Sequence, residues 1–386
     1  MRGRGWALVV VLLAGCSAGQ AGGSAPSAPA PSGLRVEQVA SGLVHGWDVG
    51  FLPGGQILVT ERPGKLALVS GGKVTDVRAD FSDVLVKGEG GLMGVVVHPD
   101  FATSRKFTTC QTHEENDRAV DIRLVTWQLS QDGTSAERVK NPLLGGLPVN
   151  PSGRHSGCRP TLAHDGSLLV GTGDTANASI AQNRQSLGGK VLRLDLNTGD
   201  AAPGNPFADA SDAAERRIYT YGHRNVQGVA PRPGSDQVFT TEHGPTADDE
   251  VNLLRAGANY GWDPSRGGTV GGYDEDVPMT DLRRFPDAVP AVWASGSPTD
   301  AICGAAFLAG PNWHDMNGVL AVTALKGAEL LLFTLTADGK VESVSVPPEL
   351  KGRYGRLRAA RLGPDGGLYV TTSNGTDDVL LRITRG

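Results

Sequence analysis

Short apolar runs alternate with tight polar turns along most of this chain. In residues 49–60, an apolar run ends at Leu52, a Pro-Gly-Gly turn follows, and a second apolar run returns over Ile57–Thr60. Two apolar runs separated by Gly and Pro predict a β-hairpin. Close copies of the pattern occur in residues 161–170 and 360–370, and looser ones in residues 95–109, 229–240 and 305–322.

Six related hairpins predict an all-β fold, a six-bladed β-propeller over residues 34–386. Their spacing of roughly 45 to 80 residues exceeds a minimal blade and predicts long loops between strands. A chain with 54 glycines and 24 prolines is turn-dense, which agrees with this fold. A β-sandwich is the alternative, but it offers no reason for six related hairpins. In a propeller, loops on one face build the functional site.

The N-terminal residues predict an exported lipoprotein. The apolar run Trp6–Ala14 is much shorter than the roughly 20 residues that span a bilayer and is typical of a signal peptide. It ends in Leu-Ala-Gly-Cys, which resembles a bacterial lipobox. We therefore expect residues 1–16 to be a lipoprotein signal peptide with Cys16 as the lipidated residue. Residues 17–33, rich in Ala, Gly, Ser and Pro, should form a flexible tether.

This pattern predicts an extracytoplasmic protein, lipid-anchored to the bacterial cell membrane. An ordinary signal peptide with a chance cysteine is the alternative. The net charge of −5 gives no basic surface for nucleic acid, so we expect no such partner.

An acidic loop in residues 242–250 is a candidate metal site. It reads Glu-His-Gly-Pro-Thr-Ala-Asp-Asp-Glu, with three consecutive acids directly after a Gly-Pro turn. Calcium prefers oxygen ligands from carboxylates and backbone carbonyls. A solvated acidic loop is the alternative.

Candidate polar residues lie just outside the predicted hairpins. His155 precedes the third hairpin, near the expected channel mouth, where a histidine can accept a proton from a hydroxyl or serve a structural role. Arg224 and Asn225 take the equivalent place before the fourth hairpin. Arg224 could hold a carboxylate or quinone oxygen, or form a salt bridge between blades. Three further cations could join Arg224 in seating a polyanionic ligand: Lys326, Arg356 and Arg358.

Several motifs, in this order, resemble the soluble pyrroloquinoline quinone (PQQ)-dependent glucose and aldose sugar dehydrogenases. The likeness runs from about Gly42 to Ile383. The motifs lie in residues 60–66, 88–94, 98–101, 154–159, 171–174, 221–228, 242–250 and 259–262.

The resemblance implies a role for each matching residue. His155 matches the general base that takes the proton of the sugar's anomeric hydroxyl while hydride passes to PQQ. Gly244 and Pro245 match the backbone ligands of the calcium under PQQ, and Glu250 and Tyr260 match ligands of a second calcium. Trp293 is a loose match to an aromatic roof over the cofactor. The matches to PQQ-contacting positions are Glu89, Arg224, Asn225, Lys326, Arg356 and Arg358.

Four residues near the expected centre depart from the family pattern. Arg154 replaces an acid that helps bind the cofactor, and its charge would lower the pKa of His155. Cys158 replaces a small residue, Gly188 a bulky one, and Ala359 an acid. These changes leave open a non-catalytic propeller lipoprotein that binds a carbohydrate or a cell-envelope partner. A calcium-dependent hydrolase is a weaker third class, because the cations match quinone-binding positions. Neither the sugar nor the electron acceptor follows from the sequence.

Apart from Cys16, three cysteines allow one disulfide and one free thiol. Cys110 and Cys158 fall in adjacent predicted blades, so we expect them to pair, with Cys158–Cys303 as the rival. No cysteine or histidine spacing resembles a zinc site.

Overall fold

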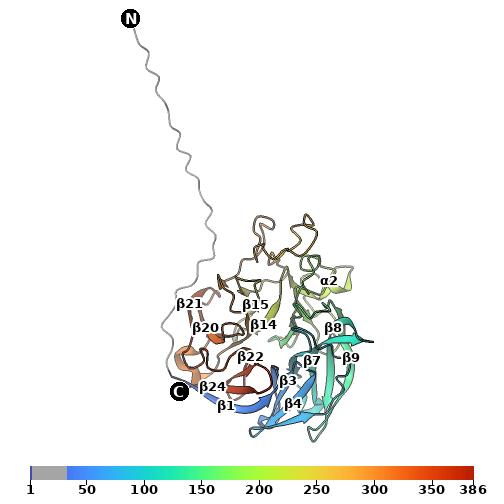
Figure 1. Cartoon of the computed structure of the whole chain (residues 1–386), viewed down its shortest axis with the longest axis vertical. Coiled ribbons are helices and arrows are strands. Elements are labelled where there is room, and N and C mark those ends of the chain that lie inside the picture. The colour runs from blue at the N-terminus through green and yellow to red at the C-terminus, as the bar shows by residue number, and fades with distance from the viewer. Residues whose placement is uncertain (2–32) are drawn as a thin grey trace.

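Six four-stranded antiparallel sheets surround a common centre (Figure 1). This arrangement confirms the predicted six-bladed β-propeller. The computed structural model describes Met1 and residues 33–386. Cys16 and almost all of the predicted signal peptide and tether therefore lie outside the described residues. In the described part, no helix is both long and apolar enough to cross a membrane.

The four strands of each blade follow one another from the centre of the ring outwards. Blade one contains β2 (Gly46–Phe51), β3 (Ile57–Glu61), β4 (Lys65–Ser70) and β5 (Lys73–Val77). Blade two contains β6 (Leu92–Val97), β7 (Lys106–Glu115), β8 (Arg118–Leu129) and β9 (Ala136–Leu147). Blade three contains β10 (Arg159–Leu162), β11 (Leu168–Gly171), β12 (Lys190–Leu194) and β13 (Ile218–Tyr221).

Blade four contains β14 (Val226–Pro231), β15 (Val238–Glu242), β16 (Glu250–Leu253) and β17 (Trp293–Ala294). Blade five contains β18 (Ile302–Phe307), β19 (Leu320–Ala324), β20 (Glu329–Leu335) and β21 (Val341–Ser345). Blade six contains β22 (Leu357–Leu362), β23 (Leu368–Thr372), β24 (Asp378–Arg385) and β1 (Leu34–Leu43). The short helices are α1 (Phe101–Ser104), α2 (Ala213–Arg217), η1 (Pro53–Gly55) and η2 (Pro311–Met316).

The six predicted hairpins are the first two strands of the six blades. Their inner strands are almost wholly buried, because neighbouring blades pack against both of their faces. Glycine makes the closest approaches possible. A Cβ on Gly94 would lie 2.3 Å from Pro160 Cδ, and one on Gly304 would lie 2.5 Å from the Ala360 nitrogen, each in the next blade. Larger residues at these positions would push the blades apart.

The ring closes through its first described strand. β1 pairs antiparallel with β24, with Leu34 opposite Arg385 and Val36 opposite Ile383 (Figure 1). The last blade is therefore built from both ends of the described chain.

A buried ionic network crosses the centre of the ring. Asp48 on β2 lies 2.8 Å from Arg159 on β10 and 2.7 Å from Arg361 on β22. Burial alone would raise the pKa of Asp48, but the two guanidiniums hold it below its usual range. The network joins three blades and keeps an ionised carboxylate away from water.

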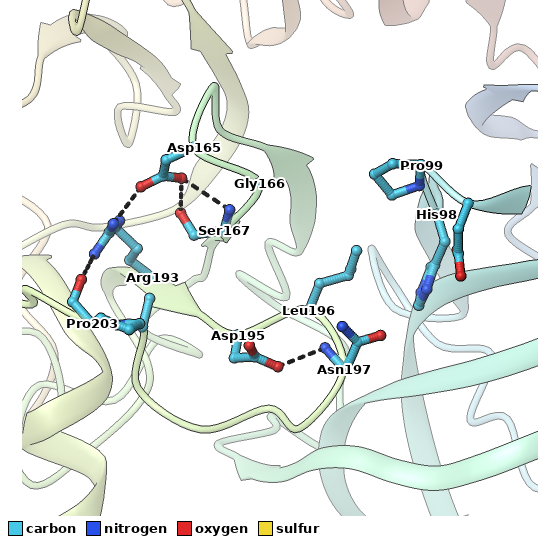
Figure 2. A pocket seen from close by; sticks show the side chains of 12 residues that line it. His98, Pro99, Asp165, Gly166, Ser167, Arg193, Asp195, Leu196, Asn197 and Pro203 are labelled. Carbon is cyan, nitrogen blue, oxygen red and sulfur yellow. Dashed lines mark hydrogen bonds and ion pairs between the residues drawn. The ribbon is translucent and has the colours of Figure 1, made fainter.

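The turn between β10 and β11 borders a cavity of about 480 Å³ that also contacts the turn after β6 (Figure 2). This cavity lies at the end of β10 opposite to His155, so it is on the other face of the ring. Arg193 forms an ion pair with Asp165 and donates to the Pro203 carbonyl at 2.8 Å, and Asp195 accepts from the Asn197 nitrogen at 2.9 Å. These charged groups are engaged in stabilising turns. The functional site is therefore expected on the opposite face, which carries His155.

Candidate active site

His155 lies just before β10 and has only 4% of its surface exposed. Its Nδ1 is 2.8 Å from Oδ1 of Asp174, which follows β11 and is fully buried. A carboxylate that accepts from Nδ1 leaves Nε2 as the basic nitrogen of the ring. The pair therefore has the geometry of a general base held by an orienting acid.

Asp174 is fixed by three further donors. Its Oδ1 accepts from the Ala176 nitrogen at 2.8 Å. Its Oδ2 accepts from Trp262 Nε1 at 2.8 Å and from the Tyr273 hydroxyl at 2.7 Å. With four donors around two oxygens, the carboxylate cannot rotate without losing hydrogen bonds.

Asp174 and Trp262 lie within sequence motifs, but the sequence alone suggested no role for either. An acid three residues after a buried strand, on the same face as His155, was a signal that could have identified Asp174. Tyr273 lies in a loop without periodicity, and the sequence carries no signal for it.

Glu89 and Asn225 meet beside the His155 segment. Asn225 Nδ2 donates to Glu89 Oε2 at 3.0 Å, and Asn225 Oδ1 accepts from the Gly157 nitrogen at 3.1 Å. Gln227 Nε2 also lies 3.3 Å from Glu89 Oε2. Burial alone would raise the pKa of Glu89, but His243, His155 and the Asn225 hydrogen bond bring it below its usual value. Glu89 is thus an ionised carboxylate beside the His155 segment.

Arg62 and Arg358 interact electrostatically with this carboxylate, and Arg356 lies close to both of them. Arg358 on β22 is buried, and Arg356 lies two residues earlier at the surface. Burial lowers the pKa of Arg62, and the charges of Arg358 and Arg356 lower it further, so the three guanidiniums are close together. The Nε atoms of Arg62 and Arg358 are buried and lack a hydrogen-bond partner among the described residues. This excess of unpaired positive charge fits a polyanionic cofactor such as PQQ, and Arg62 is an addition to the predicted set.

Arg224 lies at the edge of the same centre, and Lys326 follows β19, which ends on the same face of the ring as β11. Arg224 donates from NH1 to the His243 carbonyl at 2.9 Å and pairs through NH2 with Glu275 at 2.6 Å. Its Nε is also buried without a partner in the described chain. Lys326 is exposed, and its ammonium forms no hydrogen bond or ion pair with the other predicted cofactor-binding residues that the structure describes.

The acidic loop is held by Asp249, which the sequence left without a role. This buried carboxylate accepts from the nitrogens of Gly244 at 3.0 Å, Asp300 at 2.8 Å and Ala301 at 2.7 Å, and from the Thr299 hydroxyl at 2.5 Å. Asp248 is exposed. One of the three acids therefore braces the loop.

The carbonyls of Gly244 and Pro245 accept no hydrogen bond from any described residue, so they fit the expected calcium ligands. No cluster of three or more His, Cys, Asp or Glu side chains that could hold a metal occurs among the described residues. A calcium here would depend on backbone carbonyls.

A second arrangement fits a cation at the start of β16. Glu250 is buried opposite Glu242 in the β15–β16 pair. Burial and the neighbouring Glu242 raise the pKa of Glu250 well above its usual value, a cost that a bound cation would relieve. The Tyr260 hydroxyl already donates to the Leu253 carbonyl at 2.7 Å, which leaves its backbone carbonyl as the possible ligand.

The structure accounts for three of the four unusual residues. Cys158 forms a disulfide with Cys110 across 6.2 Å between Cα atoms, so the expected pairing is confirmed and the Cys158–Cys303 rival is wrong. Arg154 pairs with Glu275 at 3.1 Å, so its charge is compensated beside His155. A Cβ on Gly188 would lie 2.9 Å from the Gly173 carbonyl, which leaves no space for a bulky residue. Nothing in the structure explains Ala359.

The position of Trp293 does not fit the expected roof over the cofactor. Trp293 lies on β17, the outermost strand of blade four. Its ring packs edge-on against Phe333 of blade five at 5.1 Å. The side chain therefore belongs to the packing between outer strands.

Comparisons with known proteins agree with this architecture. The chain matches the Glucose / Sorbosone dehydrogenase family over residues 43–382. It is 30% identical to the aldose sugar dehydrogenase YliI of Escherichia coli K12, over 91% of this chain and 93% of that protein. A putative oxidoreductase (glucose dehydrogenase) of Thermus thermophilus has 34% identity and a TM-score of 0.77, over 91% of this chain and 100% of that one.

A third similar structure is the PQQ-bound form of an aldose sugar dehydrogenase from Streptomyces coelicolor. It shares 28% identity at a TM-score of 0.71, over 92% of this chain and 100% of that one. These matches extend along nearly the whole described chain, and they agree with the ring of six blades and with the face that carries His155. The protein therefore belongs to the glucose/sorbosone dehydrogenase family.

Proposed function

We propose that this protein is a PQQ- and calcium-dependent dehydrogenase that oxidises an aldose at the anomeric carbon. The observation that carries the proposal is the His155–Asp174 pair, buried at the mouth of a cation-rich centre. The relatives named as aldose sugar and glucose dehydrogenases support the substrate class.

When bound, PQQ and calcium supply a hydride acceptor and a Lewis acid. Gly244 and Pro245 would hold the calcium through their carbonyls, and Glu250 and Tyr260 would hold a second one. The residues proposed to hold the cofactor are Glu89, Arg224, Asn225, Lys326, Arg356 and Arg358, with Arg62 added from the structure.

His155 acts on the substrate hydroxyl. Its Nε2 accepts the proton of the anomeric hydroxyl, because Nδ1 is committed to Asp174. The imidazolium that forms is stabilised by the Asp174 carboxylate, which is already held by Trp262 and Tyr273. Burial of the pair excludes water that would compete for the proton.

A reconstitution experiment tests the function. The purified protein is loaded with PQQ and calcium, and dye reduction is measured across a panel of aldoses. We expect activity with at least one aldose and its loss in His155→Ala. His164→Ala is the matched control, because His164 is exposed at the opposite end of the same blade. Failure to bind PQQ in a titration at every calcium concentration would sink the proposal and favour a non-catalytic, carbohydrate- or envelope-binding propeller.

We also propose that the protein is exported and anchored through a lipid on Cys16. The lipobox-like sequence supports this, and so does the Cys110–Cys158 disulfide, since disulfides persist in oxidising compartments. In a bacterial host, Cys16→Ser should move the protein from the membrane fraction to the soluble fraction. A variant that stays with the membrane would contradict the anchor.

A further inference from the structure

One loop of blade four reaches over the His155–Asp174 pair. We call residues 264–284, between Trp262 and β17, the cover loop. From this loop, Tyr273 donates to Asp174 Oδ2 at 2.7 Å, and its oxygen lies 3.2 Å from His155 Nδ1. Burial and the neighbouring Asp174 raise the pKa of Tyr273 above its usual value, so the phenol stays protonated and donates. Tyr273 thus contacts both members of the proposed catalytic pair.

Glu275, two residues further on, ties the same loop to two arginines. Its Oε1 lies 2.6 Å from Arg224 NH2 and 3.1 Å from Arg154 NH2. The Arg154 guanidinium also lies 5.8 Å from the centre of the Tyr273 ring. One carboxylate therefore bridges a proposed cofactor-binding arginine and the arginine directly before His155. We call this bridge the latch.

Apolar packing holds only part of the cover loop. Tyr273 and Val277 pack on a small cluster formed by Ala181, Trp262 and Met279. Towards the tip, a cavity of about 710 Å³ separates residues 265–273 from residues 149–151 and 175–179. Because the tip is loosely packed, polar contacts contribute much of what keeps Tyr273 in place.

We propose that Tyr273 is a positioning residue for His155, and that the latch of Arg154, Glu275 and Arg224 holds Tyr273 against the pair. The inference rests on the proposed dehydrogenase function for its kinetic consequences. It also gives Arg154 a role, because this departure from the family pattern supplies one end of the latch. Arg224 then connects cofactor binding to the orientation of the base.

Steady-state kinetics of the reconstituted holoenzyme provide the first test. Tyr273→Phe keeps the ring but removes the donor to Asp174, so we expect kcat to fall about tenfold. The KM for the sugar should stay within about twofold, since Tyr273 orients the base through Asp174. Glu275→Gln should lower kcat by about threefold, because it weakens two charge-assisted hydrogen bonds.

The matched control is Asp274→Asn. Asp274 forms an ion pair with Arg266 at 2.5 Å within the same loop but contacts neither arginine of the latch. This variant should keep the wild-type kcat and KM. The inference would be overturned if Tyr273→Phe kept the wild-type kcat, or if its loss of kcat/KM came entirely from a higher KM.

A second measurement does not depend on activity. The protein has 8 histidines, so ¹⁵N-histidine labelling makes the ring N–H resonances of the cofactor-free protein tractable. The Nδ1–H signal of His155, assigned by its disappearance in His155→Gln, should shift in Tyr273→Phe and in Glu275→Gln but not in Asp274→Asn. Thermal unfolding midpoints confirm that each variant is folded.

The two proposals can fail separately. An inactive wild-type protein whose His155 signal still responds to both variants would refute the dehydrogenase and support the positioning role. A His155 signal unchanged in both folded variants would overturn the positioning role, whatever the activity of the wild type.

Discussion

Asp174 has no exposed surface and accepts four hydrogen bonds, so its orientation is fixed before any substrate arrives. In the proposed mechanism, such preorganisation lowers the cost of forming an imidazolium at His155. The carboxylate also selects which ring nitrogen is basic, a choice that an amide of the same shape cannot enforce.

Asp174→Asn should therefore lower kcat by about 100-fold or more while the protein stays folded. The asparagine keeps the size of the side chain but permits the wrong tautomer of His155. Dye-reduction kinetics on the reconstituted variant measure the effect, and circular dichroism checks the fold. A loss smaller than about threefold would mean that Asp174 does not orient the base.

Lys190 is a buried charge next to this centre. Its ammonium donates to the carbonyls of Ile180, Ala181 and Gly188 at 3.0, 2.9 and 2.7 Å. Burial lowers its pKa from 10.5 to about 7, although Asp174 opposes the shift. Between these two pH values the unfolded chain binds more protons than the folded one, so stability rises with pH.

Accordingly, the difference in unfolding free energy between wild type and Lys190→Met should grow in favour of wild type from pH 7 to pH 10.5. Denaturant titrations of both proteins across this range measure it. A flat difference would show that the ammonium stays charged, held by its three carbonyl acceptors.

At the scale of elements, the disulfide joins β7 of blade two to the residue before β10 of blade three. Its two cysteines are 48 residues apart, and cross-linking a loop of this length restricts the unfolded chain. It also anchors Cys158 only three positions after His155.

Replacing Cys110 and Cys158 together by alanine should lower the unfolding free energy by about 2–4 kcal/mol. Guanidinium titrations of wild type with and without reductant provide the control. Reductant should destabilise the wild type and leave the double variant unchanged. Equal sensitivity of both proteins would argue against the bond in solution.

The elements also show what a sequence can predict. The six hairpins were predictable because each turn carries Gly or Pro between two apolar runs, as in residues 53–55. The two-residue β17 and the cover loop were not predictable, because contacts between distant parts of the chain define them. The same contrast holds in the site: His155, Glu89 and Asn225 lie together as their motifs suggested, whereas Tyr273 and Glu275 acquire partners only through the fold.

At the scale of the whole molecule, the Asp48 network binds blades one, three and six around the axis. A buried ion pair contributes little net stability over an apolar replacement, but removing one partner leaves uncompensated charge. Here a single carboxylate compensates two guanidiniums.

Asp48→Asn should therefore destabilise the protein by about 3–5 kcal/mol, measured by chemical denaturation. Asp338→Asn, which breaks the exposed pair with Lys340, is the control and should have no measurable effect. Similar stability of Asp48→Asn and wild type would show that water or nearby groups solvate the two arginines.

The pairing of β1 with β24 also determines when blade six can be completed during synthesis. Leu34 leaves the ribosome early, yet its partner is Arg385, at the far end of the described chain. The last blade cannot be completed until β24 has been synthesised, and until then the edges of β1 and β23 that β24 will cover lack partners and are open to wrong pairing. A stop codon before β24 would therefore remove two of the four strands of blade six from the ring. β24 would be absent, and β1 would have no strand to pair with.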